Sequence, residues 1–423
     1  MAEQHEKALV PQIRFTGFTD PWEQRKLGEV ARRVTRKNEN GDSDLPLTIS
    51  AQYGLVDQRT FFNSQVASKD MSGYFLLHRG EFAYNKSTST DSPWGAIKRL
   101  EKYDMGCVST LYICFELLSG DPDFLVTYYE TDRWYKSVQL IAAEGARNHG
   151  LLNIAPDDFF ETQICIPKRI DEQRRIGAFF DRLDSLITLH QRKYDKLCVL
   201  KKSMLDKMFP KGGSLYPEIR FAGFTDPWEQ RKLGELFEES DERASDREIL
   251  SVSVANGIYP ASESDRETNP GASLANYKVV HSGDVVYNSM RMWQGAVDAS
   301  RYDGIVSPAY VVAKPNSEVY ARFFARLLRQ PMLLKQYQQV SQGNSKDTQV
   351  LKFDDFASIE ISMPASENEQ RQIGAFFDRL DSLITLHQRK YDGCANPLFL
   401  ERRISCRKPS HQNRCSATTT PSG

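Results

Sequence analysis

The stretch Ile13–Glu29 reads IRFTGFTDPWEQRKLGE, and Ile219–Glu235 repeats it with a single substitution. Between these two copies, and again after the second, lie segments that share almost nothing: residues 31–171 and residues 237–368. A repeat of this length is typical of tandem domains and not of a solenoid, whose repeats are much shorter. Two unlike segments held in nearly identical frames indicate one task performed on two different targets.

A second repeated block predicts a long helix. EQRRIGAFFDRLDSLITLHQRKYD at Glu172–Asp195 returns at Glu369–Asp392, again with one substitution. Heptad spacing from Glu172 to Met208 predicts a helix of roughly 55 Å. Ser366 and Glu369 fit a capping box at the start of the second copy. We expect the two helices to pack antiparallel as a coiled coil about a pseudo-twofold axis, the alternative being that each is an amphipathic helix packed on its own domain. Their seam residues are Ile176, Phe180, Leu183, Ile187, Tyr194, Leu197, Ile373, Phe377, Leu380, Ile384 and Tyr391.

The variable segments predict mixed α/β domains, so that the chain as a whole is α+β. Short β-branched and aromatic runs broken by Gly, Pro, Asn and Ser indicate irregular sheets. Predicted strands cover residues 45–50, 81–85, 107–116, 163–167, 249–254, 284–288, 305–313 and 358–363, and predicted helices cover 123–137 and 318–340. The expected domains are residues 1–167, a spacer helix and linker at 168–211, residues 212–364, a shortened spacer helix at 365–392 and an irregular tail at 393–423.

Composition limits the class of protein. The 423 residues are 40% hydrophobic and 26% charged with a net charge of −1, which is ordinary for a globular protein. A polyanion-binding protein of this balance has to gather its basic residues on one face. The N-terminus lacks an apolar signal sequence, and the seven cysteines form no CxxC pair. We therefore expect a cytoplasmic protein without disulfides or a zinc site.

Motifs for catalysis are weak. Lys211–Ser214 lacks the order of a Walker A loop. Asp20-Pro21-Trp22 superficially resembles an amino-methyltransferase motif, but it lacks the second proline and a glycine-rich cofactor loop before it. Pro122-Asp123 is not followed by the ExK of a nuclease, and no group of His, Cys and carboxylates has metal-ligand spacing. We expect neither a catalytic residue nor a metal site.

Polar and aromatic residues recur beside turns, in the same order in both variable segments. Arg, Lys, Asn and Gln on glycine-containing loops suit bidentate contacts to base edges, and Ser, Thr and Lys suit phosphates. The alternative for any one residue is an ordinary solvated loop. The candidates for DNA contact are Ser50, Gln52, Tyr53, Tyr84, Asn85, Lys86, Arg147, Asn148, Ser253, Asn256, Tyr287, Asn288, Arg291, Trp293, Gln294, Asn344 and Lys346.

This constellation resembles the specificity subunit of type I restriction–modification systems over residues 9 to about 392. The resemblance rests on the DPWEQRKLGE block, on Tyr-Asn after a Gly-Asp or Gly-Glu turn, and on IP…EQ…I…F…LD leading into a long helix. It implies a non-catalytic subunit in which each variable domain reads one half of a split double-stranded DNA site. It also implies that the helices separate the domains and dock two methyltransferase subunits, with restriction subunits joining the full complex. S-adenosylmethionine, ATP and Mg²⁺ are then expected on the partners, and no cofactor on this chain.

The second helix departs from the first after Asp392. Its continuation GCANPLFLERR has no heptads, and glycine and proline stop a helix. We hypothesise a reading-frame shift or recombination junction, which leaves a shorter second arm and weakens assembly with one methyltransferase. An intact frame encoding the same tail in related alleles would contradict this. Rival interpretations are a protein-interaction scaffold, a disabled allele of the subunit and an enzyme with an unrecognised site.

Overall fold

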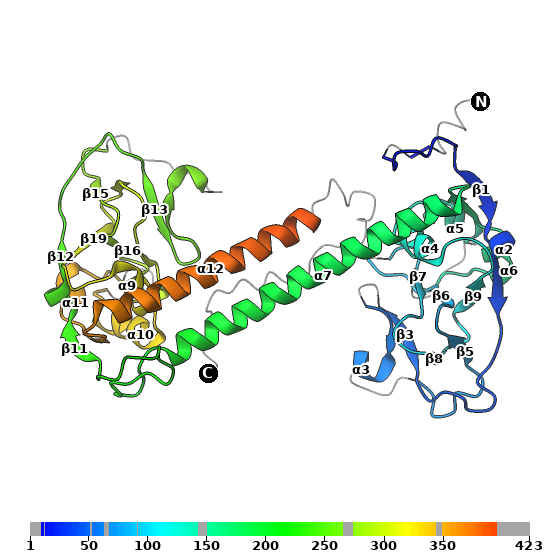
Figure 1. Cartoon of the computed structure of the whole chain (residues 1–423), viewed down its shortest axis with the longest axis horizontal. Helices are drawn as coiled ribbons and strands as arrows, with labels where there is room; N and C mark the ends of the chain where they lie inside the picture. The colour runs from blue at the N-terminus through cyan, green and yellow to red at the C-terminus, as the bar shows by residue number, and fades with distance from the viewer. Residues whose placement is uncertain are drawn as a thin grey trace. The chain divides into compact units, whose positions relative to one another are not determined.

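The computed structural model describes residues 10–11, 13–50, 53–62, 67–90, 92–142, 150–264, 274–343 and 349–395. The chain divides into two compact units. Unit 1 holds the described residues up to His190 together with the described part of 390–411, and unit 2 holds Gln191–Arg389. The boundary at His190 lies inside helix α7 (Ile170–Lys207), which gives its first half to unit 1 and its second half to unit 2 (Figure 1).

Unit 1 is built around a four-stranded antiparallel sheet of strand order β2-β9-β6-β7, with three two-stranded sheets, β3-β4, β5-β8 and β1-β10. Its elements are β1 (Glu23–Lys26), α2 (Leu27–Val30), β2 (Ala31–Val34), β3 (Leu47–Ser50), β4 (Gly54–Asp57), α3 (Gln58–Phe62), β5 (Phe75–His78), β6 (Phe82–Asn85), β7 (Ala96–Arg99), β8 (Met105–Val108), β9 (Ile113–Leu117), α4 (Pro122–Tyr129), α5 (Tyr135–Ile141), α6 (Pro156–Phe160) and β10 (Gln163–Ile166).

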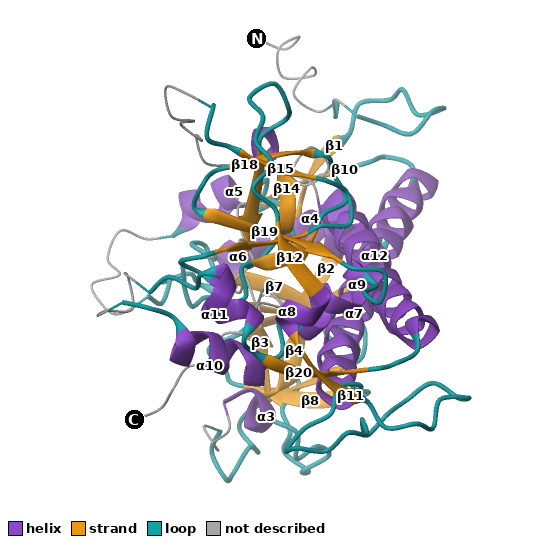
Figure 2. Cartoon of the chain, turned by 90° about the vertical axis from the view of Figure 1, so that its left-hand side faces the viewer, coloured by secondary structure: helices purple, strands orange, loops and turns teal. Residues whose placement is uncertain are grey.

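Unit 2 repeats this topology, with sheet β12-β19-β16-β17 and the pairs β13-β14, β15-β18 and β11-β20. Helices α8 and α11 pack side by side (Figure 2), where Gly234 lies against Ala357. The elements are β11 (Glu229–Lys232), α8 (Leu233–Leu236), β12 (Phe237–Glu239), β13 (Leu250–Ser253), β14 (Gly257–Pro260), η1 (Ala261–Glu263), β15 (Lys278–Val280), β16 (Val285–Asn288), η2 (Met292–Gln294), β17 (Val297–Ala299), β18 (Gly304–Val306), β19 (Tyr310–Pro315), α9 (Ala321–Leu327), α10 (Pro331–Val340), α11 (Phe353–Ala357), β20 (Glu360–Met363) and α12 (Glu367–Ala395).

The repeated blocks close each unit on itself. In unit 1, Arg14 donates two hydrogen bonds to the carboxylate of Glu172, at 2.6 and 2.7 Å, and the indole of Trp22 donates to the same carboxylate. Arg220, Trp228 and Glu369 make the same contacts in unit 2. Removing one member of a buried charge pair typically costs about 3–5 kcal/mol. Much of the repeated sequence therefore builds the domains and does not form a docking surface.

The sequence-based prediction of two heptad helices is confirmed, and in unit 2 the helices run antiparallel. Lys201 of α7 pairs with Asp381 of α12 at 2.5 Å, while Phe209, just after α7, stacks on Phe377. A higher number on one helix thus meets a lower number on the other. Leu380 joins Phe377 in the core of the unit. The same core contains Trp228 and Phe323, so this face of α12 packs on its own domain as well as against the end of α7.

Two predicted strands and two predicted helices are each divided. Residues 107–116 and 305–313 contain turns, because the amide of Tyr112 bonds to the carbonyl of Ser109 and that of Tyr310 to Ser307. Residues 123–137 form α4 and α5, and residues 318–340 form α9 and α10. The second break has a simple cause: Pro331 takes the first position of α10, where its missing N–H is tolerated.

The capping-box prediction is correct for the helix boundary and wrong for Glu369. Helix α12 begins at Glu367, directly after Ser366. The carboxylate of Glu369 is turned into the domain, where it accepts hydrogen bonds from Arg220 and Trp228. The charge-assisted hydrogen bonds between Glu369 and Arg220 are stronger than the hydrogen bond that Glu369 would make to the backbone at Ser366 in a capping box, and they decide its position.

Candidate nucleic-acid interface

Two connections of unit 1 lie side by side at one end of the sheet. The loop after β6 is hydrogen bonded to the segment before α6, because the amide of Leu152 donates to the carbonyl of Lys86 at 3.0 Å. The ammonium of Lys86 reaches the carbonyl of Ile154 in the same segment. A third connection, the β3–β4 turn, places Tyr53 where Lys102 lies 5.7 Å from the centre of its ring. These connections carry the residues that the sequence singled out.

Unit 2 joins the equivalent segments. The amide of Leu351 donates to the carbonyl of Ser289 in the β16–β17 loop at 2.9 Å, and Gln342 pairs with Val350. The β13–β14 turn lies close to β17 as well. Gly257, which directly follows this turn, is so near Asp298 of β17 that a Cβ added to the glycine would lie 1.9 Å from the carboxylate. We call these connections the loop surface of each unit. In unit 1 it consists of the described residues of the β3–β4 and β6–β7 connections together with residues 150–154. In unit 2 it consists of the β13–β14 and β16–β17 connections together with residues 342, 343 and 349–351.

The prediction that Tyr84 and Tyr287 contact DNA is wrong. Both side chains are fully buried. Tyr84 stacks on Phe159 at 4.8 Å and donates its hydroxyl to a backbone carbonyl, and Tyr287 packs against Phe356. Burial raises the pKa of both phenols. The first three residues of β6 and of β16 are all buried, and only the asparagine at the end of each strand is half-buried.

Four further candidates stabilise turns. The Ser50 hydroxyl, also buried, accepts the amide of Tyr53, and the Ser253 hydroxyl accepts the amide of Asn256. The side-chain oxygens of Asn85 and Asn288 each accept the amide two residues ahead, at 3.0 Å. Such contacts are the usual reason for Ser and Asn in turns. The recurrence of these residues in both segments therefore reflects shared loop geometry, and no base contact is needed to explain it.

The remaining candidates stay available on the loop surface. Tyr53, Asn256, Arg291 and Gln294 are exposed in the structure, and Lys86 and Trp293 are half-buried. Burial lowers the pKa of Lys86. Lys102, which sequence reasoning missed, joins this set through its position over Tyr53. Five candidates lie outside the described residues, namely Gln52, Arg147, Asn148, Asn344 and Lys346.

The predicted coiled-coil and docking residues are mostly covered within the chain. Ile373, Phe377 and Leu380 are buried, and the others, namely Ile176, Phe180, Leu183, Ile187, Tyr194, Leu197, Ile384 and Tyr391, are half-buried. The exposed apolar side chains of the repeated helices are different ones. Leu189 and its repeat Leu386 are both 44% exposed.

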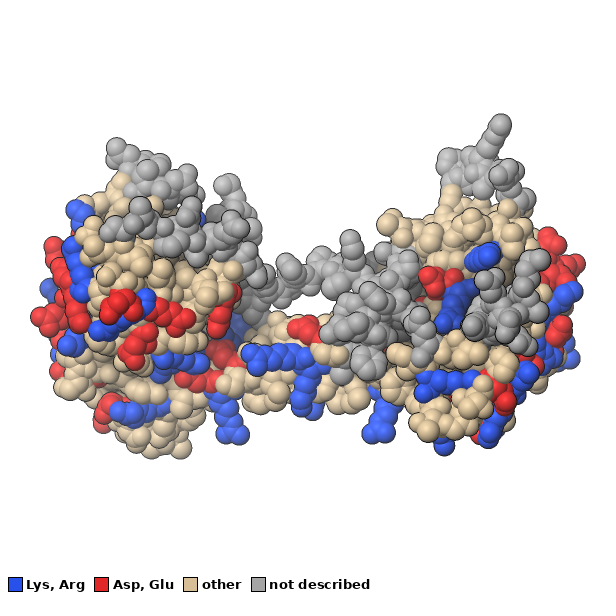
Figure 3. Space-filling view, turned by 90° about the horizontal axis from the view of Figure 1, so that it is seen from above, with Lys and Arg blue, Asp and Glu red and all other residues tan. Residues whose placement is uncertain are grey.

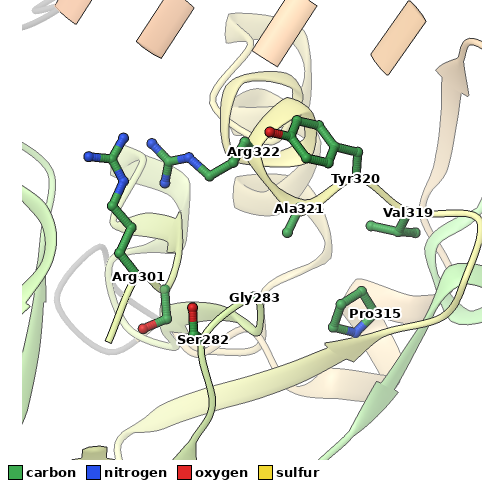
Figure 4. A pocket seen from close by; sticks show the side chains of 9 residues that line it. Ser282, Gly283, Arg301, Pro315, Val319, Tyr320, Ala321 and Arg322 are labelled. Carbon is green, nitrogen blue, oxygen red and sulfur yellow. The ribbon is translucent and has the colours of Figure 1, made fainter. Parts of the chain in front are cut away.

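Charged side chains of both signs are interspersed on the face drawn in Figure 3. One basic cluster was not predicted from sequence. Arg301, Arg322 and Arg326 converge on Asp378 of α12, at 3.2, 2.7 and 2.9 Å. Arg301 and Arg322 also line a shallow pocket of about 370 Å³ (Figure 4). Burial by itself raises the pKa of Asp378, but the hydrogen bonds and charges of Arg322 and Arg326 outweigh it, so the pKa lies below its ordinary value.

Asp378→Asn is expected to destabilise unit 2 by about 2 kcal/mol, because it leaves three arginines facing a neutral group. The matched control is Asp181→Asn at the repeated, exposed position in unit 1, where we expect a change within about 0.5 kcal/mol. The lowered pKa of Asp378 also predicts how the stability of unit 2 depends on pH. The stabilisation by this carboxylate is fully present above the ordinary aspartate pKa of about 3.9, and it is lost as the pH falls through the lowered pKa. Urea unfolding of both variants between pH 3 and pH 7 would contradict this if the two behaved alike.

Comparison with known proteins places this arrangement in a family. Residues 225–393 match the family model described as the type I restriction modification DNA specificity domain. Residues 225–393, which make up most of unit 2, therefore contain a type I restriction–modification DNA specificity domain. This match supports a role of the chain in sequence-specific DNA recognition. The matched segment contains the second copy of the repeated helix and all of the loop surface of unit 2.

Solved structures of specificity subunits are similar to this one over nearly the whole chain. The HsdS subunit from Thermoanaerobacter tengcongensis is 16% identical with a TM-score of 0.41, covering 93% of this chain and 98% of its own. The S subunit from M. genitalium is 14% identical with a TM-score of 0.48, covering 95% and 100%. Because both TM-scores are below 0.5, the assignment rests on the family model. No curated protein matches the chain.

Within the described part of the chain, no group of three or more His, Cys, Asp or Glu side chains is placed to hold a metal ion. Among the same residues, no helix has the length and apolar character needed to cross a membrane.

Proposed function

We propose that each unit of this specificity subunit reads one half of a split double-stranded DNA site through its loop surface. The observation that carries this proposal is the combination of equal frames and unequal loops. The same contacts, Arg14 and Trp22 to Glu172 and their repeats, hold both units together, while the side chains on the joined loops differ. The two units therefore present different loop side chains on the same structural framework.

The chemistry of the exposed loop residues supports this assignment. In unit 2, Arg291 directly precedes the short helix η2 and Gln294 is its last residue. Their planar groups suit bidentate contacts to guanine and adenine edges in the major groove. Asn256 on the neighbouring turn offers a further amide. In unit 1, Lys86 and Lys102 suit phosphates, and Tyr53 offers an exposed ring. Different groups on the two surfaces favour unlike half-sites.

We further propose that the exposed faces of the repeated helices dock two copies of one methyltransferase subunit. Leu189 and Leu386 are equally exposed, and Arg192 and Arg389, three residues on, are exposed as well. Exposed apolar residues and arginines are both typical of protein interfaces. An identical surface at two places fits two copies of the same partner. The methyl donor, ATP and Mg²⁺ are then carried by partner subunits.

The deciding experiment is reconstitution with a type I methyltransferase subunit, followed by mapping of methylated adenines on genomic DNA. The proposal predicts one split motif with unlike halves. A complex that forms and leaves no sequence-specific methylation would reject DNA reading by this chain and favour a scaffold or a disabled allele.

Arg291→Ala is expected to weaken binding of the cognate site by about 5- to 150-fold, the equivalent of roughly 1–3 kcal/mol for a lost bidentate contact. Specificity should relax at one base pair of the half-site read by unit 2. The control is Arg247→Ala, an exposed arginine at the other end of β13 from the loop surface. Competition binding with single-base variants of the mapped motif measures both effects, and equal losses for the two alanine variants would contradict the assignment of Arg291.

Leu189→Asp combined with Leu386→Asp is expected to weaken methyltransferase binding at least about 30-fold, because a buried carboxylate replaces an apolar contact at both docking sites. Val199→Asp serves as the control, since Val199 lies on α7 and is 70% exposed. Sedimentation of the mixed subunits gives the stoichiometry. If each single variant left one methyltransferase bound, the two-site proposal would be supported; a double variant that assembles normally would refute it.

A further inference from the structure

Two turns on or beside the loop surfaces carry large apolar side chains that the fold leaves exposed. Met290, in the β16–β17 connection of unit 2, is 45% exposed, and Leu111, in the turn between β8 and β9 of unit 1, is 57% exposed. Turn positions usually hold Gly, Asn, Asp, Ser or Pro, each of which suits the turn itself. A single exposed apolar residue is common on a protein surface, and what distinguishes these two is their place.

The turn that holds Leu111 lies at the same end of its sheet as the β6–β7 connection. Strand β9 begins at Ile113, which pairs with Tyr84 near the end of β6, so the chain before β9 and the chain after β6 are neighbours. Unit 2 has the same arrangement. There the carbonyl of Ala309, between β18 and β19, accepts the amide of Ser289 in the β16–β17 connection. Leu111 therefore adjoins the loop surface of unit 1.

Both turns hold the backbone at these residues in place. In unit 2 the side-chain oxygen of Asn288 accepts the amide of Met290 at 3.0 Å, and the indole of Trp293 donates to the carbonyl of Met290 at 3.2 Å. In unit 1 the hydroxyl of Ser109 accepts the amide of Leu111 at 3.3 Å. A residue whose backbone is already fixed loses less conformational entropy when it binds a partner. The two side chains are thus presented to solvent on backbones prepared for contact.

The neighbours of Met290 indicate the kind of group that it meets. Met290 directly precedes Arg291, and Gln294 lies on the same connection; both polar residues are exposed and suit base edges. The one methyl group that the four bases present in the major groove is the 5-methyl group of thymine, and apolar side chains contact it. Methionine suits such a contact because its unbranched thioether chain adapts to the shape of its partner. An apolar side chain among base-reading groups therefore fits thymine.

Chain spacing limits which base pair Met290 reaches. The Cα atoms of Met290 and Arg291, as adjacent residues, are about 3.8 Å apart. This is close to the rise of DNA, about 3.4 Å per base pair. The base contacted by Met290 is therefore expected within about two base pairs of the one contacted by Arg291.

We propose that Met290 and Leu111 each contact the 5-methyl group of a thymine, Met290 in the half-site read by unit 2 and Leu111 in the half-site read by unit 1. This inference rests on the proposed DNA reading and adds the chemical identity of one base in each half-site. The two residues do not repeat one another. The amide of Ser87 is bonded to Asn85 as that of Met290 is to Asn288, so serine takes the place of Met290 in unit 1. The thymines consequently fall at different places in the two half-sites.

Competition binding with deoxyuridine in the DNA tests the proposal, because deoxyuridine lacks the methyl group of thymidine and keeps its hydrogen-bonding groups. The chain is used in its complex with the methyltransferase subunit, and each duplex carries the mapped motif with one thymine replaced at a time. Replacement of one thymine in each half-site is expected to weaken binding about fourfold, the effect of one buried methyl group. Replacement of the other thymines should leave the affinity unchanged.

Met290→Ser is expected to abolish the difference between thymine and deoxyuridine in the half-site of unit 2 and to preserve it in the other half-site. Leu111→Ser should do the reverse. Both side chains are exposed, so neither substitution is expected to disturb the fold. The matched control is Met105→Ser, because Met105 is 37% exposed and lies at the opposite end of β8 from the turn that holds Leu111. Both fourfold differences should persist in this variant.

The possible failures are distinguishable. If the complex prefers the mapped motif but binds thymine and deoxyuridine equally well at every position, thymine contact is refuted and DNA reading stands. Discrimination that persists in both Met290→Ser and Leu111→Ser would also overturn the inference, because other residues would then contact the methyl groups. A complex with no preference for the mapped motif over unrelated DNA would reject the DNA reading itself, and this inference with it.

Discussion

Exchange of residues 31–162 for the equivalent segment of another specificity subunit is expected to change one half of the methylated DNA motif and to leave the other half as it was. The structure sets these limits. Strand β10 begins at Gln163 and pairs with β1 along its whole length, so the exchange retains both strands, the Arg14–Glu172 pair and all of α7. Each mismatched base pair typically costs about 1–3 kcal/mol, and two altered contacts therefore suffice to abolish methylation of the original motif.

The reciprocal exchange of residues 237–359 supplies the control, because it retains β20, which pairs with β11. It should change only the other half of the motif. Methylation mapping of both chimeras in one host measures the outcome directly. A single exchange that altered both halves, or that altered only the spacing between them, would show that the two loop surfaces do not read independently.

The shared framework of the two units could be predicted from sequence because its two sequence blocks occur in both halves of the chain. The second repeated block predicted α7 and α12 nearly to their ends, since heptad spacing reports the face that is buried. The short turns were not predicted from sequence. Leu111, for example, lies in the middle of the turn between β8 and β9, where this apolar residue is 57% exposed although its residue type suggests a strand. Hydrophobic pattern alone cannot separate two short strands from one longer strand.

The candidate interface was only partly predictable, for a different reason. Recurrence in both variable segments selected Tyr84, Asn85 and their repeats, yet residues that recur in unlike segments serve what the segments share, namely the core and the turns. Residues that differ, such as Arg291 in one unit and Tyr53 in the other, are exposed and remain the candidates for reading different bases. Arg322 and Arg326 were missed because their partner, Asp378, is 56 and 52 residues away in sequence and only the fold brings them together.

Phe209→Ala is expected to lower the free energy of unfolding of unit 2 by about 3–5 kcal/mol, the usual cost of removing a buried phenylalanine ring. The ring lies against Phe323, Trp228 and Phe377, so its loss opens a cavity where α7, the frame tryptophan and α12 meet. Pulse proteolysis, read separately on fragments of the two units, distinguishes this from a general loss of stability.

The control for this variant is Leu200→Ala on the same helix, where the side chain is 39% exposed, and the expected cost is about 1 kcal/mol or less. If Phe209→Ala weakened both units equally, α7 would transmit the damage along its length and the units would not be independent. If it weakened unit 2 alone, the end of α7 would be established as part of the second domain. The length of α7 and the stability of unit 2 would then be linked. A residue inserted in α7 to lengthen it also shifts Phe209 relative to the core that it covers.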